Sequence, residues 1–318
     1  MSRGRAMDIR RVGRRITFGL VIQAIAIVAL MIVTTGPAFA AKPSRGGGSG
    51  STTTGFDLSY PQCGSSFPST TAFGIVGVNG GLANDLNPCL GPSSSYSQSE
   101  LYWAVATSIG GTAQPKASLY VNTADPGNVY NGTPITDWPT TGTTPYGSCK
   151  TTTVTTTSGT YNVGENSQAC AWQYGYNKAS QDAAWLTSAA NAIDGQNPPT
   201  SVPTSPGNYP WWLDVETANT WQSGTTGQAM NVADLQGMVA ALKVSSVAAV
   251  GAYSTSSQWN AITGGTTSAS GSLWQIPNWI PGARALRGAI SNCKQTSFTG
   301  GTVSVTQWVS RLDGDYSC

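Results

Sequence analysis

Short apolar runs alternate with amphipathic stretches along most of this chain. The runs have the length of single β-strands, and several of them end in polar residues. Between them, side chains such as Leu101, Val105 and Ile109 recur at helical spacing and form one apolar stripe. The pattern predicts strands at 55–59, 73–79, 117–122, 209–215, 248–253, 273–276 and 303–308, and helices at 97–109, 172–193 and 232–242.

Strand and helix alternation over this length is typical of an α/β protein and favours a single-domain (β/α) barrel of the TIM type. The alternative is a doubly wound open sheet, but no glycine-rich phosphate loop follows the first predicted strand. In a barrel, functional side chains gather where the strands end. Residues at or near the predicted strand ends are Asp57, Asn79, Asn122, Asp214, Glu216, Tyr253 and Trp308.

The strand with the sequence WWLDVE at 211–216 ends in two acidic residues. Residues i and i+2 of a strand share a face, so Asp214 and Glu216 project side by side, whereas Trp211 and Trp212 point to opposite faces. Adjacent carboxylates repel each other, which favours one proton held between the two. Cleavage of a glycosidic bond needs one protonated and one ionised carboxyl: the first protonates the leaving oxygen, and the second stabilises the positive charge on the sugar.

The chain contains no histidine, and this narrows its possible chemistry. Ser-His-Asp and Cys-His catalysis are excluded, and so are the common zinc sites with histidine ligands. Acid–base chemistry therefore falls to carboxylates, tyrosine or lysine. Beyond residue 40 the chain has three glutamates, Glu100, Glu165 and Glu216, and we expect neither a metal nor a cofactor.

The first forty residues have the pattern of a secretory signal peptide. Six arginines precede an apolar run from Ile16 to about Val33, and Ala38-Phe39-Ala40 supplies a small-residue cleavage site. An uncleaved anchor is the alternative, because the run is nearly long enough to span a bilayer. We expect cleavage after Ala40, a Gly/Ser/Thr-rich linker at 41–54 and a secreted barrel domain at 55–318 that has no membrane contact.

Cleavage would also change the charge of the protein. The whole chain carries sixteen Lys and Arg against fourteen Asp and Glu, and removing six arginines and Asp8 leaves ten against thirteen. No basic run remains, which argues against a nucleic-acid partner.

Six cysteines remain after the predicted cleavage site, at 63, 89, 149, 170, 293 and 318. An even number in an exported chain indicates three disulfides, for which fifteen pairings exist. We favour the sequential pairs Cys63–Cys89, Cys149–Cys170 and Cys293–Cys318, because each closes a local loop. A metal cluster is the alternative, but no C-x-x-C spacing occurs. The Cys149–Cys170 bridge would pin a long Thr-rich insertion at about 123–167, which includes a hairpin at 151–161.

Four segments resemble motifs of the family 25 glycoside hydrolases, the secreted lysozyme-like muramidases. GFDLSYPQ at 55–62 resembles the opening G-I/F-D-x-S-x-x-Q of that family, and LDVE at 213–216 resembles its L-D-x-E. GAYS at 251–254 resembles its G-x-Y-S/T strand. TQWV at 306–309, followed by Asp313 or Asp315, resembles its closing W-Q-Y strand and final aspartate.

The resemblance implies an irregular β/α barrel, peptidoglycan as substrate and a set of site residues. Glu216 would be the general acid. Asp214 would support the oxocarbenium-like state or orient a substrate acetamido group, and Asp57 would line the opposite wall. The substrate-binding residues would be Tyr253, Gln62, Asn79, Trp308 and Asp315, with Asp313 as the alternative to Asp315. The partner would be a cell-wall polysaccharide, and we expect a monomer.

The chain also departs from the family pattern. Its closing strand reads Thr-Gln-Trp, and the cysteines and the insertion are not typical of the family. In these respects it is more similar to a group of actinobacterial secreted proteins described only as glycoside-hydrolase-like. Two alternatives to a peptidoglycan hydrolase therefore stay open: a catalytically inactive barrel that binds wall glycan, and an enzyme for another polysaccharide.

Overall fold

The computed structural model describes residues 53–80, 83, 85–93, 98–196, 201–265, 271–310 and 312–318 of the 318-residue chain. The expected signal peptide at 1–40 and all but the last two residues of the expected linker lie outside this part. Within it, no helix is long and apolar enough to cross a membrane.

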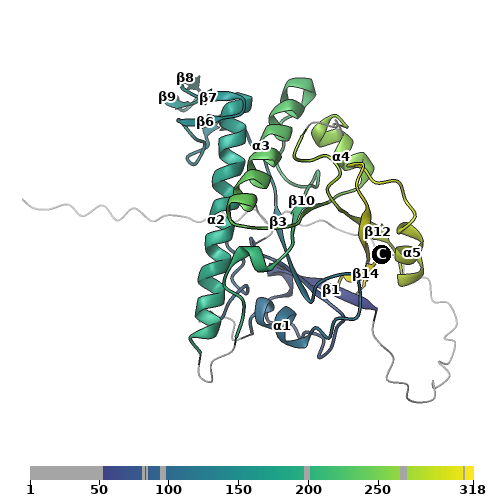
Figure 1. Cartoon of the computed structure of the whole chain (residues 1–318). Helices are drawn as coiled ribbons and strands as arrows, with labels where there is room; N and C mark the ends of the chain where they lie inside the picture. Colours follow the sequence, from purple (N-terminus) through teal and green to yellow (C-terminus); the bar gives the residue numbers. More distant parts are fainter. Residues whose placement is uncertain are drawn as a thin grey trace, which may run out of the picture. The chain divides into compact units, whose positions relative to one another are not determined.

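Eight strands close into a barrel, which confirms the predicted fold class (Figure 1). Neighbouring strands are parallel except at the last one, which pairs antiparallel with both of its neighbours. That last pairing joins the end of the chain to the first strand and excludes the open-sheet alternative. The order around the barrel is β1 (Thr54–Leu58), β2 (Gly74–Gly77), β3 (Ala117–Asn122), β10 (Trp211–Asp214), β11 (Val250–Tyr253), β12 (Asn278–Ala283), β13 (Val303–Trp308) and β14 (Gly314–Ser317).

The helices between these strands are uneven in length, which makes the barrel irregular. They are α1 (Glu100–Thr107), α2 (Gln168–Asp194), α3 (Gly224–Val244), α4 (Ser256–Thr263) and α5 (Leu286–Asn292). Between β1 and β2 the described chain has only the short 3₁₀ helix η1 (Tyr60–Gln62), and a second one, η2 (Pro206–Asn208), precedes β10.

Side-chain caps fix where three of these helices begin. The hydroxyl of Ser99 accepts a hydrogen bond from the backbone N–H of Tyr102 at the start of α1. The hydroxyls of Ser167 and Thr255 cap α2 and α4 in the same way. Each cap satisfies a backbone donor that has no partner inside the helix.

The alternation along β10 separates two apolar layers. Trp211 and Leu213 belong to the core between the barrel and its helices, whereas Trp212 packs inside the barrel with Trp279 and Val305. The two tryptophans therefore face opposite sides of the strand, as predicted. Because Asp214 shares a face with Trp212, the strand directs this carboxyl into the end of the barrel.

The large rings inside the barrel depend on two strand glycines. A Cβ on Gly55 would overlap the ring of Phe73, and a Cβ on Gly251 would overlap the ring of Trp212. Both glycines belong to motifs quoted above, GFD and GAY, and their role here is to leave room for an aromatic layer.

The predicted strand at 273–276 is wrong. This segment forms a turn in which Gln275 adopts a positive φ of 58°, and the strand of this region is β12, five residues further on. Leu273 is nevertheless buried in the main core. A short apolar run shows that a segment is buried, but it does not distinguish a strand from a packed turn.

The chain between β3 and α2 forms three small hairpins. They are made by β4 (Val129–Tyr130) with β5 (Thr133–Pro134), β6 (Gly142–Thr144) with β7 (Gly147–Cys149), and β8 (Thr151–Thr156) with β9 (Gly159–Gly164). The last of these is the predicted Thr-rich hairpin.

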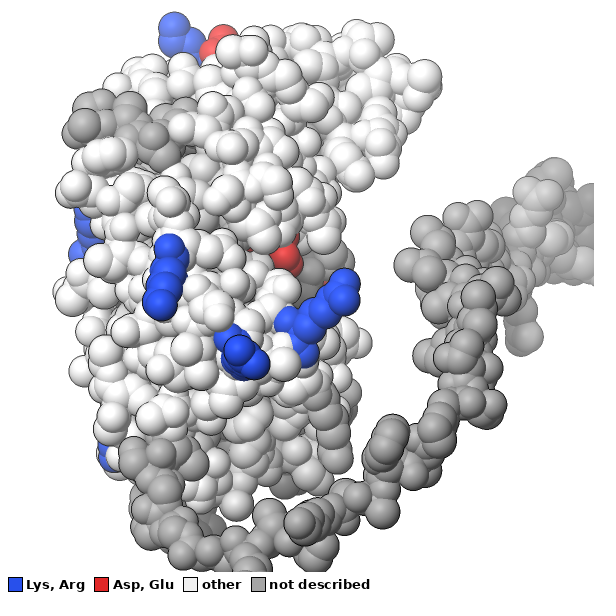
Figure 2. All heavy atoms as spheres, turned by 90° about the vertical axis from the view of Figure 1, so that its right-hand side faces the viewer, with Lys and Arg blue, Asp and Glu red and all other residues white. Residues whose placement is uncertain are grey.

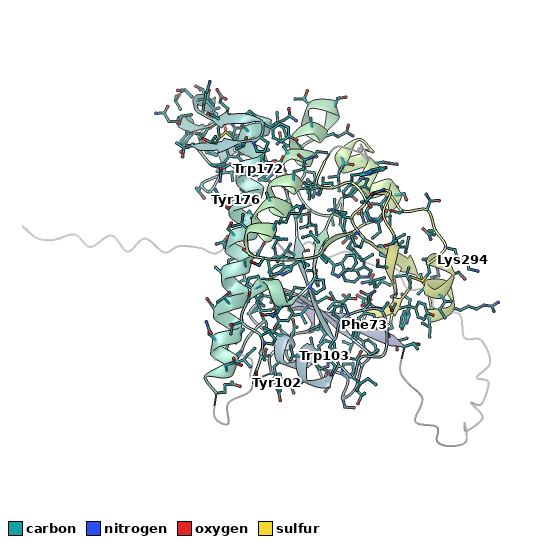
Figure 3. The ribbon with its side chains drawn as sticks, in the orientation of Figure 1. Phe73, Tyr102, Trp103, Trp172, Tyr176 and Lys294 are labelled. Carbon is teal, nitrogen blue, oxygen red and sulfur yellow. A yellow bond between two sulfur atoms is a disulfide. The ribbon has the colours of Figure 1, made fainter. Side chains whose placement is uncertain are left out.

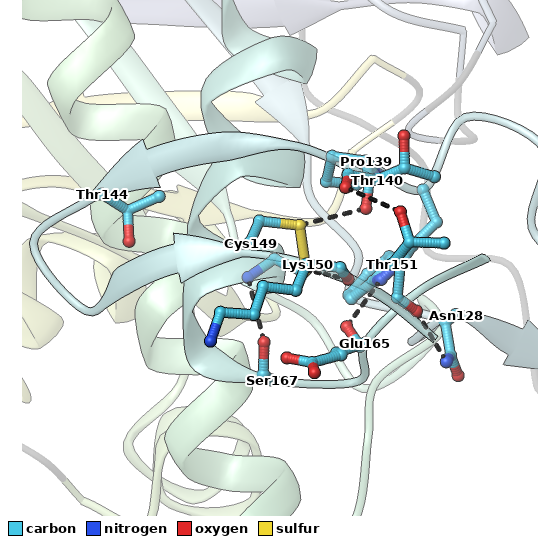
Figure 4. The surroundings of a disulfide bond; sticks show 12 residues. Asn128, Pro139, Thr140, Thr144, Cys149, Lys150, Thr151, Glu165 and Ser167 are labelled. Atoms are coloured by element: carbon cyan, nitrogen blue, oxygen red, sulfur yellow. Dashed lines mark hydrogen bonds between the residues drawn. A yellow bond between two sulfur atoms is a disulfide. The ribbon is translucent and has the colours of Figure 1, made fainter. Parts of the chain in front are cut away.

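Figure 4 shows how this insertion is anchored. Cys149 at the end of β7 is bonded to Cys170 in the first turn of α2, and the Asn128 amide donates a hydrogen bond to the carbonyl of Gly164, 2.9 Å away. Where β8 begins and β9 ends, the N–H of Glu165 donates a hydrogen bond to the carbonyl of Lys150 at 2.8 Å.

On the adjoining part of α2, the rings of Trp172 and Tyr176 stack one turn apart, with centroids 5.3 Å apart (Figure 3).

All six cysteines are paired in the predicted order, Cys63–Cys89, Cys149–Cys170 and Cys293–Cys318. The last bridge joins the end of α5 to the residue after β14, so it holds the antiparallel strand that closes the barrel. On the face seen in Figure 2, the Lys and Arg side chains lie apart from one another and form no continuous basic patch.

Candidate active site

A cavity of about 240 Å³ opens at the carboxyl ends of the parallel strands. It collects acidic, amide and aromatic side chains from β1, β3, β10, β11, β12 and β13 and from η1, which follows β1. Its lining residues are Asp57, Ser59, Pro61, Gln62, Tyr120, Asn122, Asp214, Glu216, Tyr253, Trp279, Gln307 and Asp313.

Asp214 ends β10, and the neighbouring strands hold its backbone rigidly. Its carbonyl accepts hydrogen bonds from the N–H and the hydroxyl of Thr123, at 3.2 and 2.6 Å, and it lies in register with Tyr253 of β11. The side chain is 7% exposed, and its Oδ1 has no hydrogen-bond partner among the described residues. Such an unpaired buried oxygen favours the neutral carboxyl.

Burial raises the pKa of Asp214 well above its usual range, and the charges of Glu216 and Asp57 raise it further. The raised pKa favours the protonated form of Asp214 in the free protein. Glu216 lies two residues beyond the end of β10 and is partly exposed. Its Oε1 accepts a 3.4 Å hydrogen bond from Nε2 of Gln258, and its carbonyl accepts one from Trp221.

Asp57 comes from the interior face of β1 and is 9% exposed. Its Oδ2 accepts a 2.9 Å hydrogen bond from Nε2 of Gln307 on β13. Burial raises the pKa of Asp57 to about 7, although the Gln307 hydrogen bond acts in the opposite direction because it favours the ionised form. Near neutral pH this carboxyl is therefore poised between its two states.

Gln307 links the Asp57 side of the cavity to Tyr253. While its Nε2 donates to Asp57, its Oε1 accepts a 2.9 Å hydrogen bond from the Tyr253 hydroxyl. The closing motif predicted a site role for the aromatic residue Trp308 and none for the neighbouring Gln307 side chain. Strand alternation was the available signal, since Gln307 shares the inward face of β13 with Val305.

An aromatic layer forms the floor beneath these carboxyls. The Trp279 ring makes edge contacts with Tyr253, Tyr120 and Trp212, at centroid distances of 4.5, 6.1 and 5.9 Å. This apolar floor excludes water from below, which is the physical cause of the raised pKa values of Asp57 and Asp214.

The structure shows which of Asp313 and Asp315 lines the cavity, a choice that the sequence left open. Asp313 lines the cavity, whereas Asp315 is fully buried and accepts a 2.9 Å hydrogen bond from Nε1 of Trp279 at its Oδ1. Burial and the neighbouring Asp57 hold the pKa of Asp315 well above its usual range. Asp315 therefore lies behind the wall of the cavity and Asp313 at its surface.

The remaining residues predicted for the site fall into two groups. Gln62 lines the cavity and accepts a hydrogen bond from the N–H of Ser59 at 2.9 Å. Asn79 is fully buried outside the lining and holds Asn122, whose N–H and amide donate to its Oδ1 at 2.7 and 3.1 Å. Trp308 lies on the opposite face of β13 from Gln307, over Gly314, and also lies outside the lining.

The cavity carboxyls are not among the described groups of three or more side chains whose ligand atoms lie close enough together to hold one metal ion. Among the described residues, the side chains with the spacing of metal ligands are Cys63, Cys89 and Glu100. Two of these are joined in a disulfide and cannot act as thiolate ligands.

Comparisons with known proteins give two structural similarities. No family model matches the chain, and no curated protein matches it. A bacterial lysozyme from Streptomyces coelicolor is similar at 14% identity over 84% of this chain and 92% of its own, with a TM-score of 0.38. A muramidase from Trichobolus zukalii is similar at 15% identity over 83% and 93%, with a TM-score of 0.39. Similarities this distant carry no argument about activity, so any function has to be argued from the site.

Proposed function

We propose that this protein is a secreted glycoside hydrolase that cleaves peptidoglycan or a related cell-wall glycan by carboxylate acid–base catalysis. The observation that carries the proposal is that Asp57, Asp214 and Glu216 line one open cavity at the carboxyl ends of barrel strands. In a chain without histidine, this cluster is the best equipped of the described residues to move a proton.

Glu216 is assigned the role of general acid because it lines the cavity and is more exposed than Asp214, the other acidic residue of this motif. In the proposed mechanism Glu216 delivers a proton to the leaving oxygen of the glycan. The neighbouring Asp214, whose raised pKa favours its protonated form, is the group that can replace this proton.

Asp57 is assigned the opposite wall, where its anion would stabilise the positive charge that develops on the sugar ring. The hydrogen bond from Gln307 favours that anion and orients it. The Tyr253 hydroxyl donates to Gln307, so its free lone pair is available to a sugar hydroxyl. Asn122 and Gln62 supply further polar contacts on the cavity wall.

The substrate class and the location follow from the sequence motifs and the cysteines. Four motifs that resemble wall-hydrolysing enzymes occur in order, and each contributes to the cavity: Asp57 from the first, Asp214 and Glu216 from the second, Tyr253 from the third and Gln307 from the last. Three disulfides suit an oxidising compartment outside the cytoplasm, and the segment at 1–40 is the proposed export signal. We assign the barrel domain to 55–318 and expect it to act as a monomer without a cofactor.

The test is the release of reducing ends from purified cell wall by the wild type and by Glu216→Gln. Removal of a general acid lowers the rate by roughly 100-fold or more, so we expect that loss in kcat with little change in wall binding. Glu165→Gln is the matched control, because Glu165 lies in the insertion outside the cavity, and it should keep full activity.

Two other outcomes would reject the proposal in different ways. If the wild type releases no reducing ends and both variants bind wall equally well, the protein is a catalytically inactive glycan-binding barrel. If it is active on another polysaccharide in a glycan panel and not on wall, the substrate assignment is wrong and the carboxylate mechanism stands.

A further inference from the structure

A buried carboxyl that is not part of the cavity lining lies beside one of the three disulfides. A carboxyl oxygen of Glu100 and the two sulfurs of Cys63–Cys89 all lie within 4.8 Å of one another. Glu100 is fully buried at the start of α1, and its Oε1 has no hydrogen-bond partner among the described residues. A helix start favours an acidic residue, but it does not require burial against sulfur.

The surroundings hold Glu100 in this position. Its Oε2 accepts a 2.7 Å hydrogen bond from the Asn87 amide, which also donates to the carbonyl of Gly77. The Oδ1 of Asn87 accepts the N–H of Cys89 at 3.0 Å. One asparagine thus fixes both the carboxyl and the backbone of the buried cysteine.

The two cysteine residues differ in exposure. Cys63 is half-buried and follows η1 at the surface, whereas Cys89 is fully buried. An external thiolate can therefore approach Cys63, and the sulfur that leaves is Cys89. A bare thiolate in an apolar interior is costly, so this leaving group needs a proton.

We propose that Cys63–Cys89 is a redox-active disulfide whose exchange with a dithiol reductant is assisted by proton transfer from Glu100. The thiolate of the dithiol attacks Cys63 and forms a mixed disulfide, the Cys63–Cys89 bond breaks, and Glu100 gives its proton to Cys89. The carboxylate then accepts the proton of the second thiol of the reductant. That thiolate attacks the mixed disulfide and releases Cys63, which takes a proton from water. The dithiol is oxidised to a disulfide and the protein gains two thiols.

By the reversal of these steps, Glu100 also accepts the proton of Cys89 when the bond forms. The described groups around Glu100 allow this carboxyl both to give a proton and to accept one. Burial raises the pKa of Glu100 to about 7, and the Asn87 hydrogen bond opposes this shift. The titratable side chain on the barrel side of Glu100 is Tyr120 of β3. Burial is the main cause that raises the pKa of Tyr120, and the charge of Glu100 is one of several neighbouring charges that raise it further. The salt bridge found in the described part of the chain, Lys178 with Asp137, involves none of these groups.

The other two disulfides lack this arrangement. Among the described residues, neither Cys149–Cys170 nor Cys293–Cys318 has a carboxylate at this spacing. Cys149 lies against the carbonyl of Pro139, and Cys293 lies near the hydroxyl of Thr306. These two bonds therefore serve as internal controls in the same molecule.

The bond also lies next to the proposed active site. Cys63 directly follows Pro61 and Gln62, which line the cavity, and the disulfide ties this segment to the loop that leads into α1. Reduction would free the segment that forms one wall of the cavity. An effect of this change on glycan cleavage rests on the proposed function, whereas the thiol–disulfide exchange itself does not.

The experiment follows the reduction of each disulfide in the folded, full barrel by dithiothreitol at pH 7, with alkylation and mass mapping at successive times. We expect Cys63–Cys89 to open first, and Glu100→Gln to slow its opening by roughly 10-fold or more. The rates of the other two bonds should be unchanged by this substitution, which also shows that the variant is folded. Opening of Cys63–Cys89 at the wild-type rate in Glu100→Gln would overturn the proposal.

A second measurement needs no variant. In the wild type, the rate of opening divided by the thiolate concentration of the reductant should fall for Cys63–Cys89 as the pH rises through about 7, because Glu100 loses its proton. It should stay constant for the other two bonds. A constant value for all three bonds would overturn the proposal and leave the assignment of the glycan site untouched.

Discussion

At the residue scale, the site is organised by partners that carry no charge. Gln307 holds Asp57 and Tyr253 at once, and Asn79 holds Asn122. Sequence reasoning found the acidic residues, because WWLDVE and GFD place them at strand ends. It missed Gln307 and placed Asn79 in contact with substrate, because a one-dimensional pattern does not show which amide faces the cavity and which lies behind it.

Substitution of Gln307 by Leu tests this role at the residue scale. The change removes the hydrogen bond that favours ionised Asp57, so the pKa of Asp57 should rise from about 7. The acidic limb of the kcat/KM profile should then move to higher pH, since the proposal requires ionised Asp57. Asn79→Leu is the comparison, because Asn79 touches Asn122 and not Asp57. An unchanged acidic limb in Gln307→Leu would show that Gln307 does not set the ionisation of Asp57.

At the element scale, the sequence identified most strands of the barrel and the helices α1, α2 and α3. The helices α4 and α5 and the strand β14 were not predicted, because elements this short offer few positions for a period to emerge. Helix α1 is as short as α4, but its apolar stripe at Leu101 and Val105 made it recognisable. The predicted strand at 273–276 failed for the related reason that buried turns are also apolar.

The interior packing of β10 and β11 gives a prediction about stability. Gly251→Ala places a methyl group where the ring of Trp212 lies, so we expect a loss of about 1–3 kcal/mol in the free energy of unfolding. Gly288→Ala in α5 is the control, because its Cβ would only approach the Cβ of Ala283 at 3.2 Å and alanine favours a helix. Denaturant unfolding with intact disulfides measures both. Equal stability of Gly251→Ala and the wild type would contradict the packing described for the barrel interior.

At the scale of the whole molecule, buried acids are a general feature of this barrel. Burial raises the pKa of Asp57, Asp214 and Asp315 around the cavity, and of Glu100, Asp125, Asp182 and Asp234 elsewhere. Composition could not predict this, because the count of acidic residues is low and their burial is decided by the fold. The common cause is desolvation that is only partly compensated by hydrogen bonds.

These shifts predict how stability depends on pH. An acid whose pKa is higher in the folded protein than in the unfolded chain binds more protons when folded, so stability falls as the pH rises between the two values. For Asp57 the window runs from 3.8 to about 7. The free energy of unfolding should therefore be larger at pH 5 than at pH 8, measured with urea in the absence of reductant. Greater stability at pH 8 would mean that these carboxyls are ionised and paired in the folded protein.

The central claim is that the cavity between Asp57, Asp214 and Glu216 holds the scissile bond of a wall glycan. A crystal structure of Glu216→Gln with a peptidoglycan-derived oligosaccharide tests it most directly. We predict a glycosidic oxygen within hydrogen-bond distance of the side chain at position 216, with the neighbouring sugar ring between Asp57 and Tyr253. An oligosaccharide bound at another surface while this cavity holds only water would contradict the claim.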